Sequence, residues 1–284
     1  MTELLGKLFS FDGIGELLEV PFVQTALIAC AVLGVVAGVL APLIVSRGMS
    51  FAVHGTAELS FTGGAAALLA GVAVQYGAVL GAVVAAVVFG VLGLRQRERD
   101  AVIGVVLAFG LGLGVLMLSL YEGRASNKFG LLTGSVVAID TANIAVLSVV
   151  TVLVIATLAV LYRPLLFAST DPDVAVARGV PVRMLSLVFS VLIGLTTALV
   201  VPIVGAILVL TVMITPGAAA ARVTANPVLA TVLAVVFAET ALLGGIVLSL
   251  APGLPISGYV AAIAFLIYVV CRLVGSRRRA VSVA

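Results

Sequence analysis

The sequence predicts an all-α, polytopic bundle of about nine transmembrane helices, with eight to nine as the expected range. Two observations predict this fold. First, 63% of the 284 residues are hydrophobic and only 10% are charged, whereas a soluble domain carries about 25% charged residues. Second, the apolar residues form successive long runs, and a helix that spans a bilayer needs about 20 such residues. We therefore expect one transmembrane domain over residues 1–284.

The expected spans lie at 22–46, 50–73, 77–94, 101–121, 144–163, 184–201, 203–220, 228–250 and 256–274. The sixth and seventh share one apolar run that is too long for a single ordinary crossing. Because proline disfavours continuation of a helix, we predict two short spans with a chain reversal near Pro202. Residues 1–20 form an amphipathic, acidic lead before the spans, and residues 275–284 form a basic tail after them.

Basic residues indicate the orientation, because cytoplasmic segments carry an excess of lysine and arginine. With nine spans and a cytoplasmic C-terminus, twelve of the fifteen basic residues lie inside. These are Arg47, Arg95, Arg97, Arg99, Arg163, Arg178, Arg183, Arg222, Arg272, Arg277, Arg278 and Arg279. The outside keeps Lys7, Arg124 and Lys128. The sequence thus predicts a multi-pass protein of the plasma (inner) membrane, with the N-terminus outside.

Two acids, Glu58 and Glu239, lie within the predicted spans, and the single histidine, His54, lies in the same span as Glu58. A charge at this depth costs about 2.5 kcal/mol or more, so each residue is a functional candidate. His54 and Glu58 are four residues apart, which places them on one helix face, one turn apart. They lie about 10 and 16 Å along the helix from Arg47, near the middle of a ~30 Å hydrocarbon core.

The pair has two interpretations. An imidazole nitrogen and a carboxylate oxygen that face one cavity make half of a metal site. Alternatively, a buried His–Glu hydrogen bond locks two helices together. Glu239 is a candidate third ligand, a proton carrier, or an acid that pairs with a hydroxyl in the bundle. Cys30 and Cys271 lie in apolar runs and are interpreted as small core residues.

A nucleotide-binding P-loop requires a Gly-x-x-x-x-Gly-Lys-Ser/Thr motif. The only lysines, Lys7 and Lys128, stand in no such context. We therefore expect a non-catalytic membrane subunit, and any ATP hydrolysis must occur on another chain. No permanently bound cofactor and no nucleic-acid partner are expected.

Several segments, in order from Pro21 to Val274, resemble the manganese/zinc-type permeases of ATP-binding-cassette (ABC) importers. "RGMSFAVHGTAELSFTGGAA" resembles the family's second helix, in which an Arg and a Ser-Phe precede Gly-Asp-Ala-x-Ser-His-Ala and a later Pro-Gly. "TDPDVAVARGVPVRMLSLVF" is similar to its Asp-Pro-x-x-Ala-x-x-x-Gly loop, and "VGAILVLTVMITPGAAAARVT" to the stretch that ends in Thr-Pro-Ala-Ala-x-Ala. "RDAVIGVVLAFGLGLGVLMLSL", "LLTGSVVAID" and "LPISGYVAAIAFLIYVV" resemble its fourth helix, its Phe-Gly-Ser-x-Leu segment and its closing helix. The resemblance implies a permease of the type II ABC importer fold.

The chain departs from the family motif in its second helix. Where the family has Asp, this chain has His54, and where the family has His four residues on, it has Glu58. Val53 and Thr62 replace a Gly and a Pro, although Gly63 remains. The exchange keeps one imidazole and one carboxylate at the same spacing. The resemblance therefore implies that His54 and Glu58 are metal ligands and that the transported ion is Mn²⁺, Zn²⁺ or Fe²⁺.

The resemblance also implies partners. These are cytoplasmic ABC ATPase subunits, an extracytoplasmic metal-binding protein, and a second permease, either an identical or a paralogous copy. The segment Thr215–Asn226 would be the coupling helix that docks on the ATPase. Its coupling residues would be Thr215, Pro216, Gly217, Ala220 and Arg222. Without the resemblance, an ordinary short loop is the favoured interpretation of this segment.

Two alternative functions remain at this point. A secondary transporter could use His54 and Glu58 to carry protons; such proteins often show inverted repeats, and no clear repeat is found here. A permease for a metal chelate or for cobalamin would need a wide path, in which a His–Glu pair has little purpose. A purely structural membrane protein is the least favoured reading. Co-occurrence with an ATPase and an exported binding protein would distinguish these readings.

Overall fold

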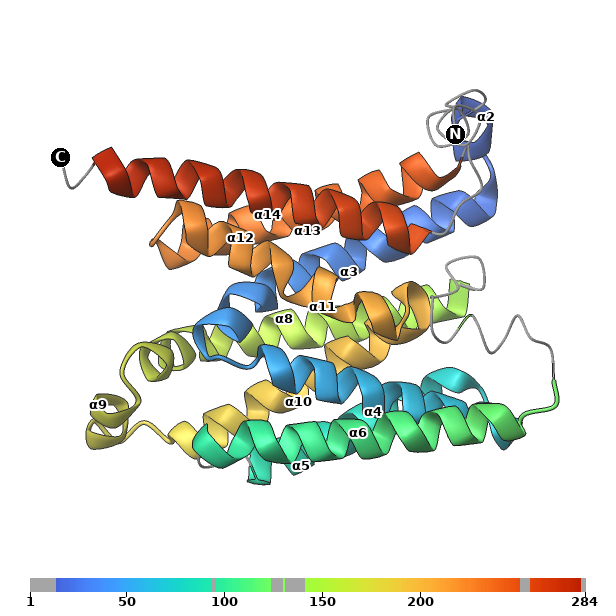
Figure 1. Cartoon of the computed structure of the whole chain (residues 1–284), viewed down its shortest axis with the longest axis horizontal. Helices are drawn as coiled ribbons and strands as arrows, with labels where there is room; N and C mark the ends of the chain where they lie inside the picture. Colours follow the sequence, from blue (N-terminus) through green and yellow to red (C-terminus); the bar gives the residue numbers. More distant parts are fainter. Residues whose placement is uncertain (1–13, 93–95, 124–129, 131–140, 251–255, 282–284) are drawn as a thin grey trace. The chain divides into compact units, whose positions relative to one another are not determined.

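The computed structural model describes residues 14–92, 96–123, 130, 141–250 and 256–281. Every regular element in these ranges is a helix (Figure 1). A short helix, α2 (Ile14–Leu18), lies in the predicted lead. The elements that follow are α3 (Pro21–Ser46), α4 (Ser50–Leu69), α5 (Val74–Leu92), α6 (Gln96–Leu120), α8 (Thr141–Thr170), α9 (Pro172–Ala177), α10 (Val182–Val204), η2 (Ala206–Leu208), α11 (Val209–Met213), α12 (Thr215–Val223), α13 (Pro227–Leu250) and α14 (Ile256–Val281). The predictions for Lys7, Arg95, Arg124, Lys128 and the segment 131–140 lie outside the described residues.

The predicted fold class is confirmed, but the number of clear spans is lower than nine. Within the described residues, seven helical segments are long and apolar enough to cross a membrane. They cover 21–46, 100–120, 144–170, 182–204, 206–223, 227–250 and 256–276. The other two expected spans are helical as well: α4 is too polar to qualify, and the apolar part of α5, Val74–Gly90, is short. The polarity of α4 comes in part from His54 and Glu58, the residues that make it a functional candidate.

The predicted boundary at Pro202 is wrong by three residues. Helix α10 continues through Pro202 to Val204, and the helix ends at Gly205, which has a φ of 95°. Glycine adopts positive φ without the steric cost that a side chain brings, so it is the usual residue where a helix stops. Beyond Gly205 the next expected span consists of three short pieces, η2, α11 and α12.

The polar stretch 169–183 contains the short helix α9, where a loop was expected. The Asp171 side chain accepts a hydrogen bond from the Val174 amide at 3.0 Å and so caps the first turn. Pro172 occupies the first helical position, where its missing N–H is harmless. Gly179, with a φ of 79°, follows the last turn. These residues are a typical set of helix start and stop signals.

The helices form two compact units. One contains most of α3 together with α12, α13 and α14, and we call it the α13 unit. The other contains α4, α5, α6, α9, α10, η2 and most of α8, and we call it the α4 unit. Each unit is described separately below. The expectation of a single transmembrane domain over 1–284 stays a prediction.

Candidate metal site

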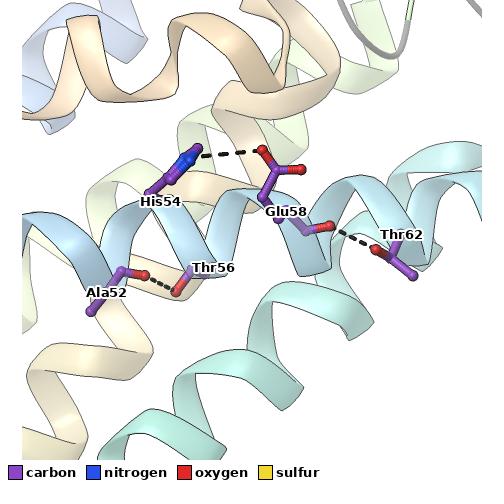
Figure 2. A network of polar contacts seen from close by, with 5 residues as sticks. All are labelled: Ala52, His54, Thr56, Glu58 and Thr62. Atoms are coloured by element: carbon purple, nitrogen blue, oxygen red, sulfur yellow. Dashed lines mark hydrogen bonds and ion pairs between the residues drawn. The ribbon is translucent and has the colours of Figure 1, made fainter. Parts of the chain in front are cut away.

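Helix α4 brings His54 and Glu58 together, as their spacing predicts. His54 Nδ1 lies 4.0 Å from Glu58 Oε1. Figure 2 shows both side chains on the same side of α4, pointing toward one another. The His54 side chain is 32% exposed and that of Glu58 is 11% exposed. The His54 side chain is therefore partly exposed, whereas Glu58 is largely buried.

The distance between the two side chains bears on both interpretations of the pair. A distance of 4.0 Å is too long for a hydrogen bond, and both residues belong to one helix. The pair therefore does not lock two helices together. His54 Nδ1 is buried and has no hydrogen-bond partner in the part of the chain that the structure describes. Two donors that each lie about 2.1 Å from one ion are at most about 4.2 Å apart, so the observed separation is compatible with a shared cation.

Glycines fix the orientation of α4 against its neighbours. The helix packs against α5, α6 and α10. Gly63 lies directly against the backbone of Gly77, and Gly81 lies against the carbonyl of Leu59, so no side chain fits at these crossings of α4 and α5. In Figure 2 the teal ribbons of the neighbouring helices lie on the side of α4 opposite His54 and Glu58. The glycine contacts thus hold α4 in the rotation that leaves the pair accessible.

A hydroxyl on the same helix joins α4 to α6. Thr62 Oγ1 lies 2.8 Å from its own-helix Glu58 carbonyl oxygen and 2.6 Å from the Gly110 carbonyl oxygen of α6. Thr62 stands where the related family has proline, and a proline there would lack this contact. A Cβ at Gly114 would lie 3.1 Å from the same hydroxyl. The α4–α6 contact therefore depends on Thr62 and on the small residues that face it.

Arg47 has a role that the sequence did not predict. It served only as a marker of orientation, yet its guanidinium contacts two other helices of the α4 unit. Nη2 donates to Ser186 Oγ at 2.8 Å, and Nη1 donates to Ser169 Oγ at 3.1 Å. The guanidinium also lies 5.4 Å from the ring centroid of Phe189. Arg47 thus ties the start of α4 to the end of α8 and the start of α10, a long-range contact that has no local sequence signal.

Glu239, the third expected ligand, lies on α13 in the other unit. Its carboxyl packs against Gly34 of α3, and its Oε1 atom is buried without a hydrogen-bond partner among the described residues. No group of three or more His, Cys, Asp or Glu side chains suited to a metal ion occurs within the described ranges. The ligand role of Glu239 therefore stays a prediction.

The expected coupling helix forms as α12, but most of its named residues point into the protein. Pro216, Gly217 and Ala220 are buried, and Thr215 is half-buried. A Cβ on Gly217 would lie 2.5 Å from the Ala41 carbonyl oxygen of α3. Ala220 belongs to a cluster with Ala41, Ala230 and Ala234. These side chains are thus packed inside the α13 unit, and the coupling role of Gly217 and Ala220 stays a prediction.

Arg222 is the exposed member of the expected coupling set. Its Nη2 atom lies 3.4 Å from the Tyr268 hydroxyl of α14, and its guanidinium lies 6.0 Å from that ring centroid. Its carbonyl packs directly against Gly275. The exposed surface continues through Ala221 and the residues 225–229. If this segment docks on a partner, the contact surface is the end of α12 and the turn into α13.

The described residues contain seven helical segments that can span a membrane and an ionisable pair within a bundle helix. Such a chain is a multi-pass membrane protein of the transporter class, since intramembrane ionisable groups mark transport paths. Residues 19–275 match the ABC 3 transport family, and the chain belongs to that family. The resemblance inferred from the motifs is thereby confirmed. The chain is a membrane-spanning permease of the ABC transporter class.

Two curated relatives cover most of the chain. The manganese transport system membrane protein MntC of Halalkalibacterium halodurans is 29% identical over 242 residues, which are 85% of this chain and 82% of the relative. The protein of the same name from Listeria innocua is 31% identical over 205 residues, 72% of this chain and 73% of the relative. Both names describe manganese transport by those proteins.

A solved structure shares the fold. PsaBC from Streptococcus pneumoniae in complex with Fab matches with a TM-score of 0.80 at 24% sequence identity. The match covers 91% of this chain and 93% of the other. The likeness extends over most of the chain and shows a shared fold.

Proposed function

We propose that this chain is the permease subunit of an ATP-driven importer for divalent transition metal ions, and that the ion passes between His54 and Glu58. The observation that carries the proposal is the pair itself: an imidazole and a carboxylate 4.0 Å apart within α4. Neither group is needed to hold the helix, because glycines on the opposite side do so. The names of the two relatives, both manganese transport proteins, support a metal ion as cargo.

Mn²⁺ is the favoured ion, and Zn²⁺ and Fe²⁺ are the alternatives. Imidazole and carboxylate ligands suit all three, so selectivity depends on geometry and on the further ligands. Glu239 is the proposed third ligand or proton carrier. The exchanged order of imidazole and carboxylate in α4 changes which donor lies deeper in the membrane. A double variant with the family order, His54→Asp with Glu58→His, is expected to retain transport and to shift the preference among the three ions.

The partners follow from the ABC class. ATP hydrolysis is assigned to a separate cytoplasmic ATPase chain, and metal delivery to an extracytoplasmic binding protein. A second permease copy completes the membrane part, either identical or paralogous. The exposed end of α12, with Ala221 and Arg222, is the proposed contact with the ATPase.

The proposed orientation places the N-terminus outside and the C-terminus in the cytoplasm of a cell bounded by this plasma membrane. Helix α9 would then be cytoplasmic, and Ala177 is an exposed residue of α9. An Ala177→Cys variant should react with an impermeant thiol reagent only after the cells are opened. Cys30 and Cys271 are both buried, so they give a low background. Labelling of Ala177→Cys in intact cells would contradict this orientation.

The proposed function is tested by uptake of radioactive Mn²⁺, with Zn²⁺ and Fe²⁺ as competitors, in cells that lack their own importers. The permease is produced together with its proposed ABC ATPase partner. His54→Ala and Glu58→Ala should each abolish uptake while the ATPase still co-purifies. Thr56→Ala is the matched control, because its hydroxyl bonds only to the Ala52 carbonyl of its own helix, at 2.7 Å, and it should transport normally.

Three results would contradict the proposal. Normal uptake by both His54→Ala and Glu58→Ala would remove the pair from the path. Uptake that persists without any ATPase and follows the proton gradient would make the chain a proton-coupled transporter. Uptake of a metal chelate but not of the free ion would favour the chelate-type permease.

A further inference from the structure

Helices α3 and α13 approach closely at two glycines of α3, one turn apart. At Gly38, a Cβ would lie 2.5 Å from the Cα of Val235 and 3.0 Å from the Ala234 carbonyl oxygen. At Gly34, a Cβ would lie 2.6 Å from Oε1 of Glu239, 2.8 Å from its Cδ and 3.2 Å from its Oε2. At both glycines the absence of a side chain lets α13 approach, but the atoms that approach differ: backbone atoms at Gly38 and a side-chain carboxyl at Gly34.

The difference separates a packing role from a positioning role. The neighbour of Gly38 is helix backbone, which cannot move unless the whole helix moves. The neighbour of Gly34 is the end of a flexible Glu239 side chain, which can rotate away at little cost. Packing of the two helices thus explains the glycine at 38 but not the glycine at 34. A glycine at 34 is required only if the Glu239 carboxyl must remain where it is.

The carboxyl lies in surroundings that give it an incomplete set of partners. Its Oε1 atom is buried and accepts no hydrogen bond in the described part of the chain. A buried polar atom without a partner is costly, and an acid within a membrane bundle is more costly still. This carboxylate oxygen needs an interaction that the described residues do not provide, and a transported cation would provide it.

We propose that Gly34 is a positioning residue for transport. Because Gly34 has no side chain, the Glu239 carboxyl packs against its backbone, and this contact places Oε1 where it binds the divalent cation. The inference rests on the proposed function, because it takes Glu239 to be a group that the cargo meets. The three atoms nearest to a Cβ at Gly34 all belong to the Glu239 carboxyl, so Gly34 acts through Glu239 and binds no metal itself. A methyl group at position 34 would displace the Glu239 carboxyl from this contact.

The test is a suppressor experiment on Mn²⁺ uptake by the permease–ATPase complex. Gly34→Ala should raise the KM for Mn²⁺ by about 10-fold, the lower end of what misplacing a ligand costs, with a normal amount of permease in the membrane. Glu239→Asp has a side chain shorter by one methylene, so the double variant Gly34→Ala with Glu239→Asp should recover a KM close to that of Glu239→Asp alone. Gly38→Ala is the control: it should reduce the amount of folded permease, and Glu239→Asp should not rescue it.

Each other outcome overturns the inference and says which part fails. If Glu239→Gln abolishes uptake but Gly34→Ala leaves the KM unchanged, Gly34 does not position the Glu239 carboxyl, and the proposed function stands. If Glu239→Gln transports with a normal KM, Glu239 does not contact the transported ion, and the positioning role of Gly34 is refuted as well. The His54 and Glu58 variants then test the proposed function separately. If Gly34→Ala lowers the amount of permease and Glu239→Asp does not restore it, Gly34 is a packing residue only.

Discussion

Helices α4 and α13 each carry one acid, but they hold it in different ways. On α4, Glu58 has a second donor, His54, on its own helix at 4.0 Å. On α13, Glu239 has no such companion, and its carboxyl lies against Gly34 of a different helix. The geometry of the first group is set by one turn of helix, whereas the geometry of the second depends on the packing of two helices.

This difference teaches where each site is vulnerable. The α4 pair keeps its internal spacing as long as α4 is helical, so the neighbouring glycines matter because they hold the helix in place. The Glu239 carboxyl loses its position as soon as α3 gains a side chain at the contact. The following variants test that contrast, in order of decreasing effect on transport.

The largest effect is expected from neutralising the acid of α4. Glu58→Gln should lower Mn²⁺ uptake by more than about 100-fold, because even a residue that only positions a ligand contributes up to that amount. Glu239→Gln leaves the α4 pair intact and should lower uptake by about 10-fold. Both are measured as initial uptake rates normalised to the amount of permease. A larger loss for Glu239→Gln would reverse the ranking of the two acids.

The next effect concerns the end of α12 and the turn into α13. Ala221 is exposed on α12, whereas Ala220 is fully buried. Ala221→Trp should weaken co-purification of the ATPase by about 10-fold, equivalent to about 1.4 kcal/mol of binding free energy, with a normal permease level. Ala220→Trp should instead deplete the permease, because it overfills the cluster with Ala41, Ala230 and Ala234. Normal ATPase binding and uptake by Ala221→Trp would leave α9 as the better docking segment.

A smaller effect is expected where α4 crosses α5. Gly63→Ala places a methyl group against the backbone of Gly77, and overpacking of this kind costs about 1–3 kcal/mol of unfolding free energy. The amount of permease in the membrane should fall several-fold. Gly104→Ala is the matched control, since its nearest contact, a Phe51 ring carbon, lies at an ordinary 3.8 Å. Equal abundance of the two variants would mean that the α4–α5 crossing is looser than the contact indicates.

The smallest effect is expected at the start of α4. Arg47→Lys keeps the charge but cannot reproduce the forked contacts with Ser169 and Ser186. The cost should be about 1 kcal/mol, seen as a Tm about 2–4 °C lower, with uptake within twofold of normal. Arg178→Lys, on the exposed end of α9, should leave the Tm unchanged. If Arg47→Lys abolishes uptake at normal stability, Arg47 belongs to the transport mechanism rather than to the packing of α4.

Local signals predicted most of the helices because length and apolarity decide them. The runs that became α3, α8, α13 and α14 needed no tertiary information, and the start of α9 follows from Asp171 and Pro172. The sequence predicted the end of α10 at Pro202 because proline is the stronger signal for a helix end. A proline nevertheless fits within a helix when its neighbours accommodate it. Gly205 stops the helix instead, through a positive φ that sequence does not display.

The candidate site was predictable to the extent that one helix contains it. The four-residue spacing of His54 and Glu58 fixes their contact, and the structure agrees. Other contacts join residues far apart in the chain, so no spacing rule reveals them. Examples are the contact of Glu239 with Gly34 and the hydrogen bonds of Arg47. The burial of Gly217 and Ala220 was missed for the same reason: small residues suit contact with a partner and contact within the chain equally well.

The polarity of α4 has a consequence for how the protein is made. A helix that is not apolar enough to qualify as a span by itself is a poor substrate for insertion one segment at a time, because each charged residue opposes partition into lipid. We expect α4 to leave the insertion machinery together with a neighbour that covers its polar face and its glycines. The order of synthesis offers α3 first and α5 next, so a nascent chain cut after Leu69 should integrate α4 poorly, and one extended past Leu92 should integrate it well.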